Sequence, residues 1–258
     1  MRVGDSPPPG FEALADAEVF THGHLPVAAA YCRRLGVVEL VDRMVPTRME
    51  ISPGLVVQAM VLDTLSGRSP LYRLEEFMEG QDVGLLLGES VSPGAFNDNN
   101  VGRSLDAIFT AGTSKILTEL GIRATEAFRL DSSSASYDTT STSVWGDYRA
   151  CESDLPPPGP VITRGHSKDH LPELKQFMTE LLCVDRGVPI FGRTLDGNSS
   201  DKASNGRAKR SPAFPNWSAT PPPGSMNDWA RNMAIMPARP PARSRKRPTA
   251  SPPRAPTN

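Results

Sequence analysis

Asp138 is the residue of this chain whose type and surroundings best suit chemistry. It lies in residues 134–148, a run otherwise made mostly of hydroxyl, β-branched and aromatic residues. That composition predicts a β-strand, and Gly146-Asp147 predicts the turn that ends it. Strands are depleted in Asp because its side chain competes for backbone hydrogen bonds, so an Asp in mid-strand needs a reason such as a metal ion or a surface position.

A carboxylate held by a strand is the first element of a two-metal nucleotidyl-transfer site. In such a site two or three carboxylates hold a pair of Mg²⁺ ions about 4 Å apart, and the ions activate the attacking oxygen and stabilise the leaving oxygen. Oxygen ligands suit Mg²⁺ because it is a hard ion, and a central strand supplies rigidity. From Asp138 alone, the structural alternative is a capped strand end.

His166 and His170 are four residues apart, the spacing at which two histidines on one helical face bind a metal ion. The Glu that a zinc protease carries after the first His is replaced by Ser167. The two histidines are close to Arg164 and Lys168 in the sequence. We therefore expect them to make polar loop contacts or to contact DNA phosphate.

Residues 25–128 have apolar residues at helical spacing and predict five or six helices. One helix is expected to begin at residue 25 and a second to span residues 37–44, with Gly36 separating the two. The clearest start is Ser52-Pro53, a cap residue followed by a first-turn proline. Nothing in this region has the pattern of a catalytic site.

Residues 66–69 form a short turn before a helix that Ser69-Pro70 is expected to start in the same way as Ser52-Pro53. Two helices joined so have the outline of a helix-turn-helix, whose second helix enters the DNA major groove. Arg68 and Arg73 would then contact DNA. The favoured alternative is packing within a helical bundle, because the second helix carries more Glu than Arg.

The pattern changes from helical to strand-like after residue 128. Residues 177–184 and 188–195 are apolar runs of strand length, and Asp185-Arg-Gly187 between them predicts a hairpin turn. With the strand of Asp138 they give three antiparallel strands, half of a mixed sheet. The predicted fold class is therefore α+β.

The last part of the chain differs in composition from the rest. Residues 206–258 hold ten Lys and Arg, one Asp and 12 of the 26 prolines, whereas residues 1–205 hold 18 Lys and Arg against 28 Asp and Glu. The segment lacks an apolar period and cannot bury enough apolar surface to offset its chain entropy. We predict a disordered tail rich in Pro and Arg.

Cys32, Cys151 and Cys183 are far apart and form no Cys-x-x-Cys pair, which argues against a disulfide framework or a zinc site. No apolar run approaches the roughly 20 residues of a membrane span, and the start of the chain lacks the apolar core of a signal peptide. We expect a cytoplasmic protein with no membrane partner.

Four separated stretches follow one another in an order that is informative. They are residues 52–74, Tyr137-Asp-Thr-Thr-Ser141 with Val144-Trp-Gly-Asp-Tyr148, Gly165-His-Ser-Lys-Asp-His170 with Leu174-Lys-Gln176, and Asp196-Gly-Asn-Ser-Ser-Asp-Lys202. Over about residues 25–205 the chain thereby resembles the front portion of an insertion-sequence transposase of the DDE type. That group has a helical N-terminal domain before a ribonuclease-H-like catalytic core.

The resemblance implies a site, a partner and a division of the chain. Asp138 would be the first catalytic acid and a Mg²⁺ ligand, with Asp131 the second choice, and transposon ends would be the DNA partner, with a homo-oligomer a further possibility. The predicted DNA contacts are Arg68, Arg73, Arg164, His166, Lys168 and His170. The predicted parts are a flexible leader (1–24), a helical domain (25–128), the first part of an incomplete ribonuclease-H-like core (129–205) and the tail (206–258).

The resemblance stops near residue 205. In the family a second catalytic Asp follows the Asp-Gly-Asn loop and a Glu lies further on, whereas here Asp228 is the only acid after Asp201, and its surroundings are rich in Pro and Arg. The sequence therefore predicts a truncated or frameshifted transposase that is inactive alone. The alternatives are a non-catalytic DNA-binding regulator of transposition and a nucleic-acid binder that acts through its basic tail.

Overall fold

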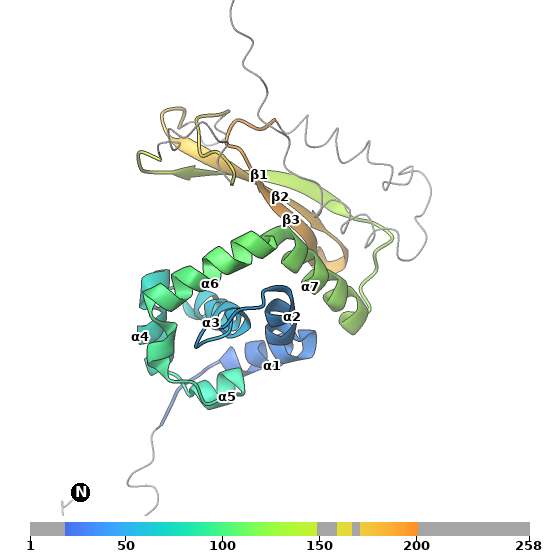
Figure 1. Cartoon of the computed structure of the whole chain (residues 1–258). Coiled ribbons are helices and arrows are strands. Elements are labelled where there is room, and N and C mark those ends of the chain that lie inside the picture. Colours follow the sequence, from blue (N-terminus) through green and yellow to red (C-terminus); the bar gives the residue numbers. More distant parts are fainter. Residues whose placement is uncertain (1–18, 149–158, 167–170, 201–258) are drawn as a thin grey trace, which may run out of the picture.

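The computed structural model of the chain describes residues 19–148, 159–166 and 171–200 (Figure 1). Within them a helical region comes first and a three-stranded antiparallel sheet follows, which confirms the predicted α+β class. The predicted tail and most of the leader lie outside the described residues. The helices are α1 (Leu25–Leu35), α2 (Val37–Met44), α3 (Pro53–Ser66), α4 (Leu74–Glu79), α5 (Val83–Leu87), α6 (Asp98–Ala111) and α7 (Thr113–Phe128). The strands are β1 (Ser136–Val144), β2 (Lys175–Cys183) and β3 (Pro189–Leu195).

Local signals place most of the helix ends. The hydroxyl of Ser52 accepts a hydrogen bond from the backbone N–H of Leu55 at 3.2 Å, and Pro53 takes the first position of α3, as predicted. Gly36 has φ 62°, a left-handed conformation that suits glycine, and it separates α1 from α2. Side-chain caps and glycine stops act through neighbours in the chain, which is why the sequence reveals them.

The helix expected after Ser69-Pro70 starts later than predicted. The segment begins with a 3₁₀ turn, η2 (Leu71–Arg73), and α4 follows with only six residues. Pro70 has φ −57° and ψ 139° and precedes the first turn instead of taking its first position, and no side chain caps that turn. The backbone N–H of Ser69 donates to Oδ1 of the buried Asp63 at 3.2 Å, which ties the turn back to α3.

Counting α5, the described chain has seven α-helices, more than the five or six predicted. The α5 helix has five residues, too few to display a hydrophobic period. Asp82 caps it by accepting a hydrogen bond from the backbone N–H of Leu85 at 2.9 Å. The turn-rich stretch before α6 contains a second 3₁₀ turn, η3 (Pro93–Phe96).

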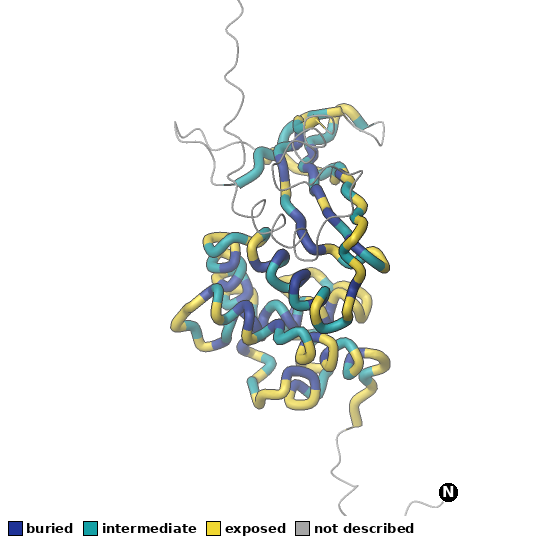
Figure 2. Tube along the Cα trace, turned by 90° about the vertical axis from the view of Figure 1, so that its right-hand side faces the viewer, coloured by how far each residue is buried: buried dark blue, intermediate teal, exposed yellow. Residues whose placement is uncertain are grey.

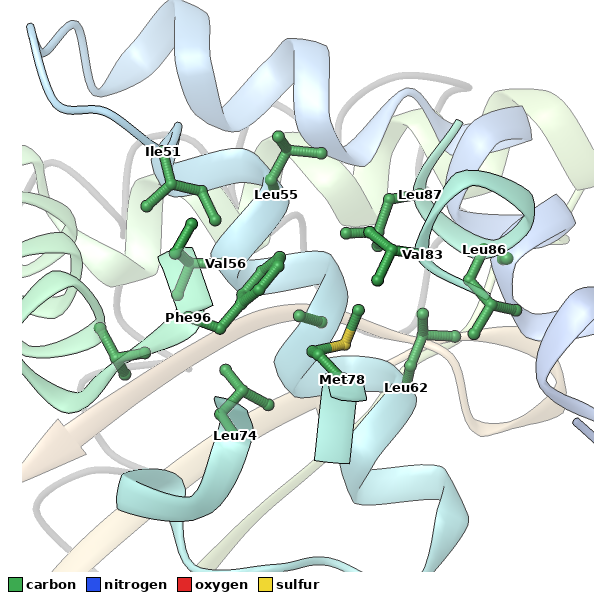
Figure 3. Close-up of a cluster of buried hydrophobic side chains, with 14 of the residues drawn as sticks. Ile51, Leu55, Val56, Leu62, Leu74, Met78, Val83, Leu86, Leu87 and Phe96 are labelled. Atoms are coloured by element: carbon green, nitrogen blue, oxygen red, sulfur yellow. The ribbon is translucent and has the colours of Figure 1, made fainter. Parts of the chain in front are cut away.

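The core of the helical region is built around α3. This helix is buried on most of its sides, and the buried side chains that cluster with it come from α1, Ile51, α4, α5, η3 and α6 (Figure 3). Phe96 from η3 and Leu74 and Met78 from α4 point into this cluster and are at most 1% exposed. A helix with apolar residues on most of its sides needs neighbours on those sides, which explains why several short elements pack against α3.

The three strands form a meander in the order β1-β2-β3, so β1 lies at one edge of the described sheet. β1 and β2 pair from Ser136 opposite Cys183 to Val144 opposite Lys175. The turn between β2 and β3 contains η4 (Asp185–Gly187), and it confirms the predicted hairpin. All strand pairs described are antiparallel, as expected for the first half of the predicted sheet.

Alternate residues of each strand lie on opposite faces of the sheet. The Glu180 face carries Thr139, Glu180 and Arg193 in one row across the three strands, and the Asp138 face carries Asp138, Leu181 and Gly192 in the next row. Buried and exposed positions alternate along parts of the strands (Figure 2). Thr139 and Glu180 are buried, whereas Asp138 is exposed and Leu181 is 39% exposed. The pattern of β1 therefore places the predicted catalytic acid on its accessible side.

Helix α7 connects the helical region to the sheet and packs on β3 (Figure 1). A Cβ atom on Gly121 would lie 2.6 Å from Cα of Ile190, and one on Gly192 would lie 2.7 Å from a methyl group of Leu117. Both glycines therefore permit an approach that a larger residue would block. Glycine at these two positions fixes the distance between the helix and the sheet.

Replacing Gly121 by alanine is expected to destabilise the fold by about 1–3 kcal/mol, because the backbone of β3 must move to admit the methyl group. Gly102 of α6 is the matched control, since nothing lies within 4 Å of the place that a Cβ atom would take there. The Gly102→Ala variant should gain roughly 0.5–1 kcal/mol from higher helix propensity. Urea unfolding followed by circular dichroism measures both, and equal effects would contradict the tight approach of α7 to β3.

Candidate functional site

Asp138 is the third residue of β1, and its exposed side chain lies on the Asp138 face. Its Oδ1 accepts a hydrogen bond from the backbone N–H of Thr139 at 2.8 Å. Leu181 stands directly opposite on β2, and Gly192 follows on β3. The carboxylate therefore has open surroundings and one local bond, and its second oxygen is available to a ligand on that side.

The described residues contain no group of three or more His, Cys, Asp or Glu side chains that would hold a metal ion. Asp138 is thus not part of a three-ligand set among the described residues. Two Mg²⁺ ions need two or three carboxylates around them, so these residues do not by themselves fit the predicted two-ion site. Asp138 has the right chemistry for one ligand of such a site and no more.

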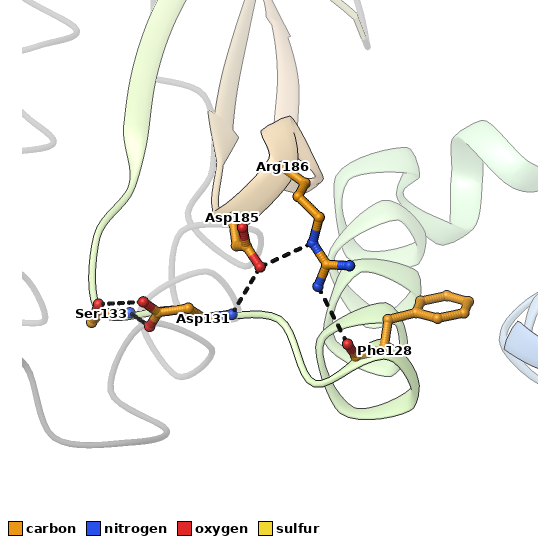
Figure 4. Close-up of polar contacts among 5 residues, drawn as sticks. All are labelled: Phe128, Asp131, Ser133, Asp185 and Arg186. Carbon is orange, nitrogen blue, oxygen red and sulfur yellow. Dashed lines mark hydrogen bonds and ion pairs between the residues drawn. The ribbon is translucent and has the colours of Figure 1, made fainter.

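Asp131, the second choice for the catalytic acid, belongs to the connection between α7 and β1 and not to a strand. Its carboxylate accepts hydrogen bonds from the backbone N–H and the hydroxyl of Ser133 at 2.8 and 2.9 Å. Its backbone N–H donates to a carboxylate oxygen of Asp185 at 3.4 Å, and Asp185 also pairs with Arg186 (Figure 4). Asp131 therefore joins this connection to the hairpin turn.

The hydrogen bonds from Ser133 lower the pKa of Asp131 below the usual value of 3.8, the backbone bond contributing most. A carboxyl group with a lowered folded-state pKa stabilises the fold above its unfolded value, and the contribution is lost as the pH falls through the folded value. Replacing Asp131 by asparagine should therefore lower the free energy of unfolding at pH 7. The decrease should be smaller below about pH 4. Urea unfolding between pH 3 and 7 tests this, and a difference that does not depend on pH would contradict it.

Arg68 and Arg73 flank the turn between α3 and α4 and are exposed. Arg73 forms an ion pair with Glu76 at 2.8 Å, and Leu74 and Met78 of α4 face the core. A helix of six residues is only about 9 Å long, and α4 is acidic in its first turn. The geometry of this turn matches the bundle-packing alternative better than a recognition helix.

Arg164 and His166 are exposed and lie in a segment that runs beside the start of β2. The Nε2 group of Gln176 donates to the carbonyl of Gly197 at 2.7 Å and, more weakly, to that of His166 at 3.4 Å. Two of the four stretches on which the resemblance rests therefore converge here, the third around residues 165 and 176 and the fourth around residue 197. Lys168 and His170 lie outside the described residues.

This convergence lies at the far end of the strands from Asp138. Gln176 is opposite Ser143, whereas Leu181 is opposite Asp138, so five residues separate the two places along β2. At about 3.3 Å per residue the separation is roughly 17 Å. Arg164 and His166 thus lie close to each other in the structure, but they do not lie close to Asp138.

Several arginines of the described chain bind carbonyl groups at the C-terminal ends of helices. Arg33 donates to the end of α5, Arg34 and Arg186 to the end of α7, and Arg123 to the end of α1. These guanidinium groups complement the negative end of each helix dipole and satisfy its last carbonyls. Residues 19–128 hold nine Lys and Arg against 13 Asp and Glu, so this region offers little basic surface for phosphate.

Tyr137, Glu180 and Arg193 form a polar group that was not predicted from the sequence. The hydroxyl of Tyr137 donates to Oε2 of Glu180 at 2.5 Å, and Nη2 of Arg193 lies 2.6 Å from Oε1 of Glu180. The side chains of Glu180 and Arg193 are 1% and 10% exposed. A signal was present, since Glu180 and Arg193 interrupt the two apolar runs that flank the predicted hairpin.

The fold and the site together define an α+β protein in which a helical region precedes an antiparallel sheet with an exposed Asp on its first strand. Residues 17–122, which cover the helical region up to α7, match a family described as a domain of unknown function, DUF4277. The chain matches none of the curated proteins and none of the solved structures compared with it. No described helix has both the length and the apolar character needed to cross a membrane.

Proposed function

We propose that residues 25–205 are the front portion of a DDE-type transposase, a protein of DNA transposition. The helical region would bind transposon ends or mediate assembly, and the three strands would be the first half of a ribonuclease-H-like core. The observation that carries the proposal is the position of Asp138, exposed on a strand that lies at one edge of the described sheet.

The edge position matters because a two-metal site needs a second carboxylate close to the first. A strand added beside β1 would lie about 4.8 Å away, and a carboxylate at its matching position would reach an ion bound to Asp138. Had β1 been the middle strand, β2 and β3 would pair with both of its edges. In the order β1-β2-β3, one edge of β1 has no neighbouring strand in the described sheet.

On this proposal the chain has no strand-transfer activity by itself. Among the described residues Asp138 belongs to no group of three or more metal-binding side chains, and a lone carboxylate does not hold two Mg²⁺ ions in register. Mg²⁺ would neutralise charge on the DNA phosphates and activate the attacking oxygen in an intact relative. Here Asp138 would offer one oxygen ligand to such an ion.

Gel-shift titrations with the terminal sequences that flank the gene in its own DNA test the proposal. We expect tighter binding to these ends than to scrambled DNA of the same length, and no cleavage when Mg²⁺ is added. Equal binding to both DNAs would contradict it, and Mg²⁺-dependent cleavage would contradict the predicted inactivity. Translating the DNA after codon 205 in all three frames is a separate test, since another frame should continue with a strand bearing an Asp and later a Glu.

The charge distribution favours a second candidate, a nucleic-acid binder that acts through its tail. Residues 206–258 carry ten Lys and Arg and one Asp, in contrast to the acidic helical region. Binding through these residues would be sequence-independent and would weaken steeply with salt. Deleting residues 206–258 should then abolish binding, whereas a transposase-type helical region would keep its preference for the ends.

A further inference from the structure

The amino-acid pattern of β1 specifies its register on β2 only weakly. From Thr139 to Ser143 every residue on both faces is Ser or Thr, so sliding the strand replaces one hydroxyl side chain by another. Register is normally set by an apolar face that must stay buried. A slip by one residue is opposed because it would turn Asp138 to the buried face, but a slip by two residues keeps every side chain on its own face.

A two-residue slip would nevertheless displace Asp138. It would move the carboxylate about 6.6 Å along the strand, which exceeds the separation of roughly 4 Å between the two ions of a two-metal site. The position of Asp138 therefore depends on a contact that distinguishes register steps of two. The hydroxyl pattern of β1 supplies no such contact.

Within β1, Tyr137 supplies such a contact through Glu180 of β2. Tyr137 is the single aromatic residue of β1, and its hydroxyl reaches diagonally from its place opposite Leu182 to Oε2 of Glu180 at 2.5 Å. Glu180 is buried and is held from the other side by Arg193 on β3. After a two-residue slip the place of Tyr137 would be taken by Thr139 or Ala135, and neither side chain is long enough to reach the carboxylate.

We infer that Tyr137 and Glu180 are positioning residues that fix the register of β1 and so place Asp138. A buried acceptor that has lost its donor is costly, so the contact penalises slipped registers even though it is one hydrogen bond. Its meaning for metal binding rests on the proposed function, whereas the register itself does not. Polar groups that specify register have precedent in coiled coils.

Cross-linking to the natural Cys183 reads the register directly. Ser136 is opposite Cys183, and directly opposed residues have Cα atoms about 4.5–5.5 Å apart, within the reach of a disulfide. The Ser136→Cys variant reports the native register, and Ser134→Cys and Asp138→Cys report slips by two residues in the two directions. Each is made in the full chain with Cys151→Ser, oxidised with diamide and quantified by mass spectrometry of the linked peptides.

With Tyr137 present we expect the cross-link from the Ser136→Cys variant to dominate. Adding Tyr137→Phe, which removes one oxygen atom and should leave the fold intact, is expected to raise the out-of-register fraction roughly tenfold, as for loss of a hydrogen bond to a charged group. If cross-links still come from position 136 alone, the inference is wrong. This result is independent of DNA and Mg²⁺, so failure of the proposed function would leave it unchanged.

Two substitutions of Glu180 separate the hydrogen bond from general loss of stability. Glu180→Gln and Glu180→Leu both lose the ion pair with Arg193, but glutamine keeps an oxygen that accepts from Tyr137. We expect slipped cross-links to rise about tenfold with leucine and to stay near the native level with glutamine. Equal slippage in the two variants would overturn the role assigned to this hydrogen bond.

Discussion

Replacing Arg193 by methionine is expected to lower the free energy of unfolding by about 3–5 kcal/mol. The substitution keeps a long side chain but removes the charge that faces Glu180, whose side chain is 1% exposed. A buried carboxylate left without its partner is strongly destabilising, because neither water nor another cation compensates its charge. Urea unfolding at pH 7, followed by circular dichroism, measures the effect.

The matched control is the double variant Glu180→Leu with Arg193→Met. Removing both charges leaves no unpaired ion in the sheet, so the double variant is expected to be more stable than Arg193→Met alone. It should still lose about 1–3 kcal/mol, because the hydrogen bond from Tyr137 to Glu180 is lost. The double variant would contradict this if its loss of unfolding free energy equalled the sum of the losses in Glu180→Leu and Arg193→Met. The two charges would then not interact.

Replacing Phe96 by alanine is expected to cost about 3–5 kcal/mol. Phe96 is fully buried between α3 and the elements that wrap it, so the substitution loses the burial of an aromatic ring and leaves a cavity. It lies on η3, a four-residue turn that depends on this contact for its position. Urea unfolding of the purified variant again provides the measurement.

Phe109 of α6 provides the comparison for Phe96. The same atoms are deleted in Phe109→Ala, but Phe109 is 47% exposed in the folded protein, so about half of the burial that Phe96 contributes is absent here. We expect a change of at most about 1 kcal/mol. If Phe109→Ala were as destabilising as Phe96→Ala, the core of the helical region would not be centred on α3.

The acidic character of the helical region bears on both proposed functions. Acids outnumber bases in it, Arg33, Arg34 and Arg123 bind carbonyls at helix ends, and Arg73 is paired with Glu76. We therefore expect few phosphate contacts from this region. A protein that recognises DNA with few phosphate contacts shows a shallow dependence of affinity on salt. The salt dependence of binding, measured with and without residues 206–258, therefore distinguishes the helical region from the tail as the DNA-contacting part.

Much of the fold was predictable because its signals are local. Ser52-Pro53, Gly36 and Asp185-Arg-Gly187 act on backbone groups within a few residues, so they mark ends and turns without knowledge of the rest of the chain. The same signals fail where the backbone adopts another conformation. Pro70 has φ −57° and ψ 139° and precedes η2, so the helix start expected at Ser69-Pro70 is lost.

The candidate site was predictable only in part. The sequence by itself determined that Asp138 lies on a strand followed by a hairpin, because residue type and alternation carry that information. The tertiary structure decided that this strand is at the edge of the described sheet, that Asp138 is on its exposed face, and that residues 165, 176 and 197 meet far from it. It alone revealed the contact from Tyr137 to Glu180, because cross-strand partners are set by the pairing of segments about forty residues apart, and no local pattern records which residues will be opposed.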